Sequence, residues 1–265
     1  MSASTHEKTR PIPSTLGYRQ AALITGLSMI YTGLVLASGA DRLTATRPEL
    51  ATTIPALFAS EALRVAGAQA LADGDVRATL ALGKRALHDA PADPQSAAML
   101  GAGLLASGDQ APADQAFRVA GRLGWRVPIT QSYWLSKALS ASDYDLAALR
   151  LDALLRQQPQ LLSQRQVMDP IERNPAGRAA LIKRMALHPE WLPVYTADVQ
   201  SAPPDVVMQR SDVFEEAGHQ GLMLGCDAIA PTIARLVALN LREQAGRLAK
   251  AHCRAQQPAP NSIAP

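Results

Sequence analysis

The hydrophobic pattern of the chain opens with one long apolar stretch. Residues 1–20 are polar, whereas residues 21–40, AALITGLSMIYTGLVLASGA, contain no charged side chain. Twenty helical residues rise about 30 Å, which matches the hydrocarbon core of a bilayer. The pattern therefore predicts a polar tail at 1–20 and a transmembrane helix, acting as a signal anchor, at 21–40.

The charges that flank this stretch predict its orientation. Lys8, Arg10 and Arg19 precede it against the single acid Glu7, whereas the charges just after it cancel. The positive-inside rule then keeps the N-terminus in the cytoplasm and sends the rest of the chain across the membrane. In a bacterium this is the inner membrane, with the bulk of the chain in the periplasm.

A cleaved signal peptide is the alternative. Ser38-Gly39-Ala40 resembles a cleavage site, which would release a secreted protein after cleavage near Ala40. The long polar segment before the apolar stretch, and the length of the stretch itself, favour the retained anchor.

Small side chains share one face of the predicted membrane helix: Ala22, Gly26, Gly33, Ala37 and Ala40. Such a stripe lets a second membrane helix come close, so a homodimer joined through it is one hypothesis. A generic anchor rich in Ala and Gly, facing lipid, explains the stripe equally well.

After the apolar stretch, one turn signal recurs at a fixed spacing. Gly74-Asp75, Gly108-Asp109 and Ser142-Asp143 follow one another at steps of 34 residues. A period of this size is typical of stacked helical hairpins, and no long run alternates apolar and polar residues as strands do. The predicted fold is all-α, with a linker or first helix at 41–59 and three hairpins in an α-solenoid over 60–161.

Small residues and prolines repeat within the three units. The first has Ala66, Gly67, Ala86 and Pro91, the second Gly101, Ala113, Phe117 and Ala120, and the third Ala138, Ala147 and Pro159. On these residues the region 60–161, about 40% of the chain, resembles tetratricopeptide (TPR) repeats. Thr79, Gly83 and Trp125 depart from the family pattern.

The resemblance implies a concave groove lined by the first helix of each repeat. By family position its lining comprises Glu61, Arg64, Ala68, Gln95, Ala98, Ala102, Ser132, Tyr133 and Ser136. The Lys and Asn clamp with which some relatives bind C-terminal carboxylates is absent. The small, mostly neutral lining fits an extended peptide or a partner helix, or else the chain's own C-terminal helices.

The region 162–255 is predicted to be helical, with Pro-rich joints. Asn174 is placed as an N-cap with Pro175 at the first helical position. A short helix is expected around 190–199, a longer one from 205 to 217 ended by Gly218, and a degenerate terminal hairpin over about 228–254. Residues 256–265 read as a disordered tail.

Cys226 and Cys253 fall at opposite ends of the two helices of that last hairpin. In an antiparallel hairpin these ends are neighbours, so a disulfide is one expectation and two buried free thiols the other. No Cys-x-x-Cys or His-x-x-x-His spacing accompanies either residue, so we expect no metal site.

Composition and motifs argue against several classes of function. The chain carries a net charge of +3 with scattered basic residues, so no nucleic-acid-binding face is indicated. No phosphate-binding loop, nucleophile elbow or zinc hydrolase motif occurs, and we expect no catalytic residue and no cofactor. Two sets of ionisable residues fit solvated helix faces. The first, Asp212 and Glu216, has an acid/base pair as its alternative. The second has a site for an acidic partner as its alternative and comprises Glu243, Arg247, Lys250 and Arg254.

These expectations combine into a membrane-anchored periplasmic scaffold or adaptor that is not an enzyme. It would bind proteins through the TPR groove and the membrane through residues 21–40. The resemblance implies the class of anchored repeat proteins that serve secretion, surface-polysaccharide assembly or, as an alternative, cytochrome c maturation. A different alternative is an enzyme whose site, without a motif, lies in residues 162–255.

Overall fold

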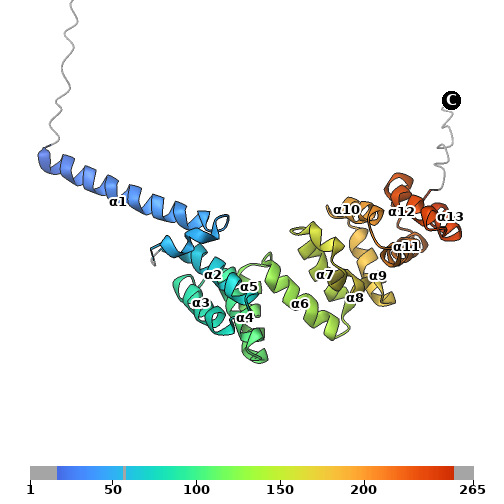
Figure 1. Ribbon diagram of the computed structural model, residues 1–265, viewed down its shortest axis with the longest axis horizontal. Coiled ribbons are helices and arrows are strands. Elements are labelled where there is room, and N and C mark those ends of the chain that lie inside the picture. Colours follow the sequence, from blue (N-terminus) through green and yellow to red (C-terminus); the bar gives the residue numbers. More distant parts are fainter. Residues whose placement is uncertain (1–16, 56–57, 254–265) are drawn as a thin grey trace, which may run out of the picture. The chain divides into compact units, whose positions relative to one another are not determined.

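The computed structural model describes residues 17–55 and 58–253, and within them every regular element is a helix (Figure 1). The predicted all-α class is confirmed. The predicted tails, 1–20 and 256–265, fall outside the described residues except for residues 17–20. The chain divides into two compact units, Met1–Pro91 and Ala92–Pro265.

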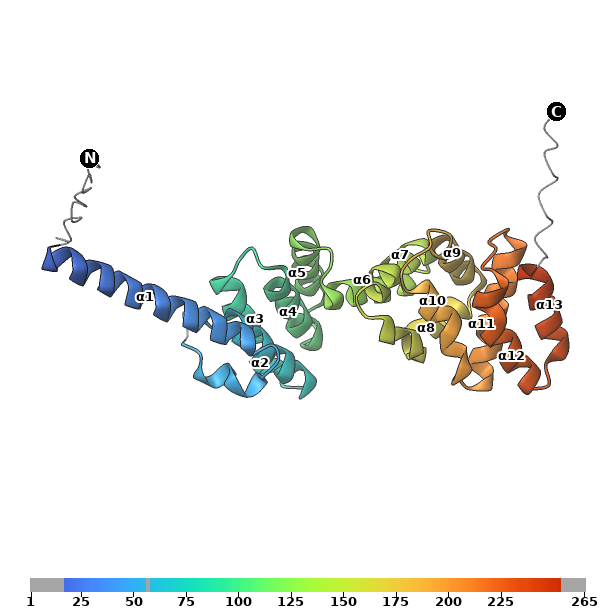
Figure 2. The same cartoon turned by 90° about the horizontal axis from the view of Figure 1, so that it is seen from above.

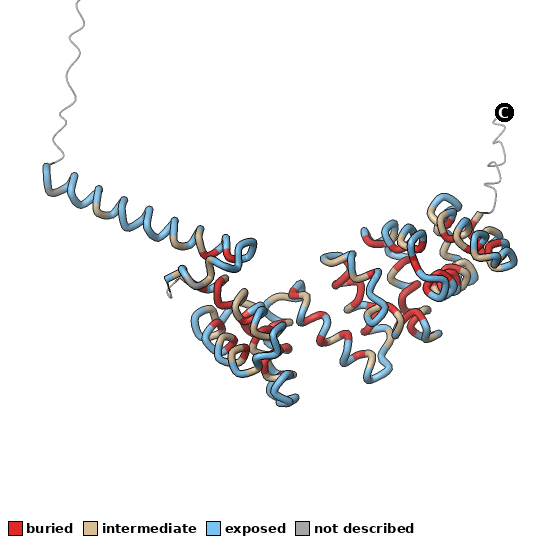
Figure 3. The backbone as a smooth tube through the Cα atoms, in the orientation of Figure 1, coloured by how far each residue is buried: buried red, intermediate tan, exposed pale blue. Residues whose placement is uncertain are grey.

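The first unit begins with the apolar helix α1, Tyr18–Leu43. Its segment Gln20–Leu43 has a mean hydropathy of 1.7 and is long enough to cross a membrane. α1 is exposed along almost its whole length and becomes buried only near its C-terminal end (Figure 3). The prediction of an N-terminal helix with the length and composition of a membrane span is therefore confirmed.

Asp41, near the end of α1, holds the first hairpin against that helix. After α1 the chain passes through the 3-10 helix η1, Pro48–Thr53, and returns as α2, Ser60–Ala72. The Asp41 carboxylate, 7% exposed, accepts hydrogen bonds from the backbone N–H groups of Glu61 and Ala62, both at 2.9 Å. The first N–H groups of a helix have no partner inside it, so this carboxylate caps α2.

We expect Asp41→Ala to lower the local stability of α2 by about 1–2 kcal/mol, because two backbone donors lose a charged acceptor. Hydrogen exchange of peptides covering residues 60–72, measured on the full chain in detergent, reports the change. Arg42→Ala, at the exposed neighbouring position, should leave the exchange of those peptides unaltered. Equal exchange in both variants would contradict a capping role for Asp41.

Three helical hairpins follow α1 with a constant spacing. The first consists of α2 and α3 (Val76–Asp89), the second of α4 (Pro94–Ala106) and α5 (Gln110–Leu123), and the third of α6 (Pro128–Ser140) and α7 (Tyr144–Leu155). Both the first helices and the second helices start at intervals of 34 residues. The second and third hairpins belong to the second unit, where their paired helices lie side by side (Figures 1 and 2).

The recurring turn signal has a common backbone geometry. The residue at its first position has a positive φ each time: Gly74 at 74°, Gly108 at 88° and Ser142 at 57°. The N–H of the following Asp donates to a carbonyl five residues earlier, at 2.8–2.9 Å, which ends the first helix of each hairpin. Asp75 and Asp143 also cap the second helix with their side chains. The sequence repeat thus encodes the same helix stop three times, and the side-chain cap of the next helix at two of the three turns.

Aromatic stacking joins the second hairpin to the third. The rings of Phe117 on α5 and Tyr133 on α6 are stacked with centroids 4.1 Å apart, and the Tyr133 hydroxyl donates to Asp114. A Cβ at Gly101 would lie 3.0 Å from the Phe117 ring, so α4 approaches α5 closely only because this position lacks a side chain. Tyr133 therefore serves the packing of the second unit.

The rest of the second unit is a set of helices, from three to sixteen residues long, around one apolar core. In chain order they are η3 (Pro159–Ser163), α8 (Arg165–Glu172), α9 (Pro175–Met185), α10 (Leu192–Ala197), η4 (Asp198–Gln200), α11 (Pro204–His219), α12 (Cys226–Ala238) and α13 (Arg242–His252). The core includes the fully buried Trp191, Tyr195 and Phe214. The Asn174 side chain accepts from the N–H groups of Ala176 and Gly177, so the predicted N-cap of α9 is confirmed.

α11 does not end where the sequence predicted. It continues to His219, and the residue with positive φ after it is Gly221. A Cβ at Gly218 would lie 2.8 Å from the Cβ of Ala251 on α13. Gly218 is therefore a packing position rather than a helix stop.

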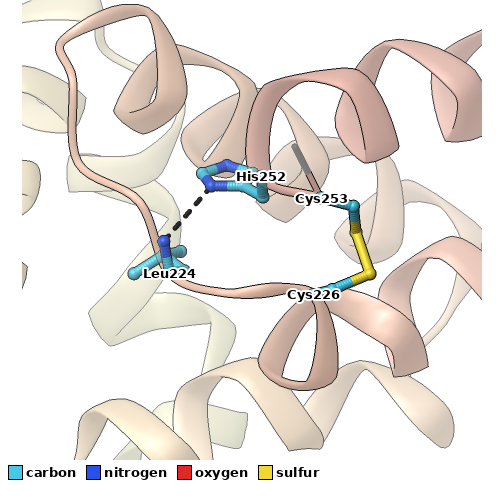
Figure 4. Close-up of a disulfide and its surroundings, with 4 residues drawn as sticks. All are labelled: Leu224, Cys226, His252 and Cys253. Atoms are coloured by element: carbon cyan, nitrogen blue, oxygen red, sulfur yellow. Dashed lines mark hydrogen bonds between the residues drawn. A yellow bond between two sulfur atoms is a disulfide. The ribbon is translucent and has the colours of Figure 1, made fainter. Parts of the chain in front are cut away.

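The last two helices form a hairpin closed at its open end by a disulfide. Asn240, in the turn between α12 and α13, has a φ of 62°, as at the three earlier turns. Cys226 and Cys253 are joined with their Cα atoms 4.6 Å apart (Figure 4). The neighbouring His252 is buried, accepts from the N–H of Leu224 at Nδ1 and donates from Nε2 to the carbonyl of Phe214.

Candidate functional site

The second unit contains a pocket of about 190 Å³ lined by charged side chains. Its wall is built by η3, by α8 and by the turn from η4 into α11. Three acids and two arginines line it: Asp169, Glu172, Asp198, Arg165 and Arg210. This cluster lies within residues 162–255, where the enzyme alternative placed its site.

Arg210 is the centre of the cluster and is 1% exposed. Its guanidinium donates to Asp198 at 2.9 Å and to the carbonyl of Leu162 at 2.6 Å, and it lies 4.7 Å from the centre of the Tyr195 ring. Its Nε is 3.6 Å from a carboxylate oxygen of Glu172. One side chain of α11 thereby connects η3, α8, α10 and η4.

Glu172, at the end of α8, is equally buried and has partners at both oxygens. The Tyr195 hydroxyl donates to one oxygen at 2.8 Å and the amide of Gln209 donates to the other at 2.6 Å. Burial raises the pKa of Glu172 above its ordinary value of 4.5 and outweighs the lowering effects of Arg210, Tyr195 and Gln209. The folded chain therefore holds a proton on this carboxyl more readily than the unfolded chain.

Tyr195 completes the buried network. Its ring packs edge-on against both Trp191 and Phe214, with centroids 5.9 Å and 5.5 Å away. Burial first, and then the negative charge of Glu172, raises the pKa of Tyr195 well above its ordinary value. The phenol stays neutral and keeps donating its hydrogen to Glu172.

The rim of the pocket is a chain of ion pairs. Arg165 contacts Asp169 at 3.4 Å and Asp205 at 2.5 Å, and Arg173 contacts Asp169 at 2.9 Å. Together with the contacts of Arg210 and Glu172, these ion pairs link every ionisable side chain of the pocket lining to another. A network in which every charge is paired can cross-link helices and retain one titratable proton, on Glu172. The volume of the pocket falls below the roughly 300 Å³ at which small-molecule sites begin.

The predicted groove residues have different environments. Glu61 and Arg64, half-buried on α2, form an ion pair with each other, and Ala68 is exposed. On α4, Gln95 is exposed, whereas Ala98 and Ala102 are buried; on α6, Ser132 and Ser136 are exposed, whereas Tyr133 is buried. In the second unit, the predicted positions open to solvent are therefore Gln95, Ser132 and Ser136.

The other predicted residues are spread over separate elements. A Cβ at Gly26 or Gly33 would meet nothing within 4 Å, so the stripe of small residues on α1 borders open space there.

Glu216 pairs with Arg178 at 2.7 Å, and Arg247 pairs with Glu215 and Glu243. Asp212 is exposed as a residue on α11, but partial desolvation of its carboxyl still raises its pKa. Arg254 lies outside the described residues. In the described part of the chain, no three acids, histidines or cysteines gather to hold a metal.

Compared with protein-family models, curated proteins and solved structures, the chain matches none of them.

The raised pKa of Glu172 predicts a pH dependence of stability. Because the folded chain binds this proton more readily, stability contributed by the group is present below pH 4.5 and is lost as the pH rises toward the folded pKa. We expect the free energy of unfolding of the wild type to fall relative to that of Glu172→Gln over this window, by at most about 1.4 kcal/mol per pH unit. Denaturant titrations of both full chains at a series of pH values from 4.5 upward measure the free energy of unfolding of the wild type minus that of the variant. A value that rises with pH would contradict the prediction.

Proposed function

We propose that the protein is a membrane-anchored helical-repeat scaffold that binds protein partners. The observation that carries the proposal is the threefold recurrence of one hairpin, with helix starts and turns repeated at 34 residues, after an apolar helix long enough to cross a membrane. Repeats of this period stack into solenoids whose surfaces bind other proteins. We interpret residues 60–161 as TPR-like repeats of such a solenoid.

Two features support a periplasmic position for the repeats. The basic residues that precede α1 favour a cytoplasmic N-terminus under the positive-inside rule. The disulfide between Cys226 and Cys253 suits an oxidising compartment, whereas cytosolic disulfides are rare. Alkaline phosphatase and green fluorescent protein, each fused after residue 253 in a bacterium, test the orientation. An active phosphatase with a dark fluorescent fusion is expected, and the reverse pattern would reject it.

Binding through the repeats is tested by crosslinking the full chain in membranes before solubilisation and identifying its partners. The variant Gln95→Arg/Ser132→Arg/Ser136→Arg adds bulk and charge to the exposed positions of the predicted groove. Gln157→Arg/Gln160→Arg, exposed in the turn after α7 and in η3, is the matched control. Partners lost from the first variant and kept by the second support a scaffold. Partners kept by both place binding elsewhere, and a chain that crosslinks to no protein contradicts the proposal.

The charged pocket favours a second candidate, an enzyme of residues 162–255 with Glu172 as an acid. A buried carboxyl of raised pKa beside a buried Arg is a recognised mark of catalytic sites. The occupied partners and small volume argue for a structural network instead. A bound small molecule that protects the wild type, but not Glu172→Gln, against unfolding would favour the enzyme.

A further inference from the structure

The second half of α5 and the turn after it carry an unusual combination of exposed side chains. Arg118 and Arg122 lie four residues apart on α5, beside the likewise spaced Val119 and Leu123, and all four are exposed. The turn adds Trp125 and Arg126. We call these six residues the α5 basic patch.

The charge of this patch is unbalanced. Residues 115–142 contain no Asp or Glu, and the nearest preceding acid, Asp114, is engaged by Lys137 at 3.4 Å and by the Tyr133 hydroxyl. Within the described residues, none of the three arginines of the patch forms an ion pair. Three exposed arginines without a counter-ion therefore fall within residues 118–126, and only Arg122 lies in the last helical turn, where the helix dipole favours a cation.

The apolar members of the patch are the second observation. Trp125 is 54% exposed and Leu123 43%, whereas the other two tryptophans are half-buried or buried. The Arg126 guanidinium lies 4.7 Å from the centre of the Trp125 ring. A Trp with aliphatic neighbours and a rim of arginines is the composition of surfaces that insert into the headgroup region of anionic bilayers.

From this charge complementarity we propose that the α5 basic patch docks on anionic phospholipid headgroups of the membrane that α1 spans. The inference rests on the proposed membrane anchoring. Tethering through α1 would make docking intramolecular, which lowers the affinity that three arginines and one Trp must supply. Docking would bring the second unit onto the membrane surface.

The test uses the full chain in nanodiscs whose lipids carry bromine near the headgroup, which quenches nearby Trp. The signal of Trp125 is the difference between the wild type and Trp125→Phe. We expect quenching in discs of phosphatidylglycerol, little in discs of phosphatidylcholine, and release at 1 M salt, where screening acts over about 3 Å. Arg118→Gln/Arg122→Gln/Arg126→Gln should weaken docking about a hundredfold and abolish the Trp125 signal.

Arg77→Gln/Lys84→Gln, which removes two exposed basic side chains of α3, is the matched control and should keep the signal. Two results would overturn the docking proposal. The first is that Trp125 is not quenched. The second is that its quenching is the same in both lipids and is unchanged in the triple Arg variant. Absent quenching would leave an acidic protein surface as the partner of the patch, whereas charge-independent quenching would mean that Trp125 contacts lipid without the arginines. Co-purification of the chain with the discs is measured separately and tests the anchor. A chain that stays with the discs without Trp125 quenching refutes docking but supports the anchor. A chain that does not stay with the discs refutes the anchor.

Discussion

Arg210→Met should lower the free energy of unfolding by about 3–5 kcal/mol, the largest effect expected for a single substitution in this protein. The replacement leaves Glu172 buried without its cation and frees the carbonyl of Leu162, while Met retains most of the apolar stem. Denaturant unfolding of the full chain in detergent, followed by the fluorescence of the buried Trp191, measures the loss.

A matched control and a double variant identify the cause. Arg173→Met removes an exposed rim guanidinium and should change stability by less than about 0.5 kcal/mol. Arg210→Met/Glu172→Gln removes both charges and should be less destabilised than the sum of its single changes, because position 172 no longer carries an unpaired buried charge. Additive losses would mean that the pair is not coupled, and a loss below 1 kcal/mol for Arg210→Met would contradict its central position.

Much of the helix layout could be predicted because its signals are local. The Gly-Asp pairs fix helix ends through a positive φ, which glycine adopts freely, and a side-chain cap on the next helix. α8 was not predicted, since it is short and carries Pro170 in its interior, which reads as a break. Tertiary contacts with η3 and α9 hold that helix, and no local sequence pattern predicts those contacts.

The charged pocket was missed for a related reason. Its residues come from segments that lie up to 48 positions apart, and each appears alone in an unremarkable stretch. One signal was available. Arg210 has Val206, Val207, Val213 and Phe214 at the i−4, i−3, i+3 and i+4 positions, so it occupies the centre of an apolar helix face. A charge in that position must be buried and paired, which indicates an ion-pair network even when its partners cannot be named.

Tyr133 shows the limit of assigning a face by family position. Its place in the repeat predicted a groove residue, yet its ring stacks on Phe117 and its hydroxyl reaches Asp114. Which side of a helix is covered depends on the size of the residues on its neighbour, and Gly101 creates the space into which Phe117 fits. The sequence contains these residues without showing that they meet.

Removing the disulfide is the second large effect that we expect. Cys226→Ser/Cys253→Ser should lower the free energy of unfolding of the last hairpin by about 3–4 kcal/mol, because the bond closes a loop across a separation of 27 residues. The loss should be concentrated where α13 packs on α11. There His252 bridges Leu224 and Phe214 beside the bond, and Gly218 allows the close approach of Ala251.

Hydrogen exchange of peptides covering residues 242–252 measures this loss, and a reductant supplies its internal control. Adding reductant to the wild type should produce the same increase in exchange as the double Ser variant, and adding it to that variant should change nothing, because α13 then has no bond to lose. Exchange in α7 (Tyr144–Leu155), which is not part of the last hairpin, should stay constant throughout. If the reduced wild type kept its protection, packing of Leu248 and His252 on the core would be sufficient to hold α13, and the bond would add only to kinetic resistance against unfolding.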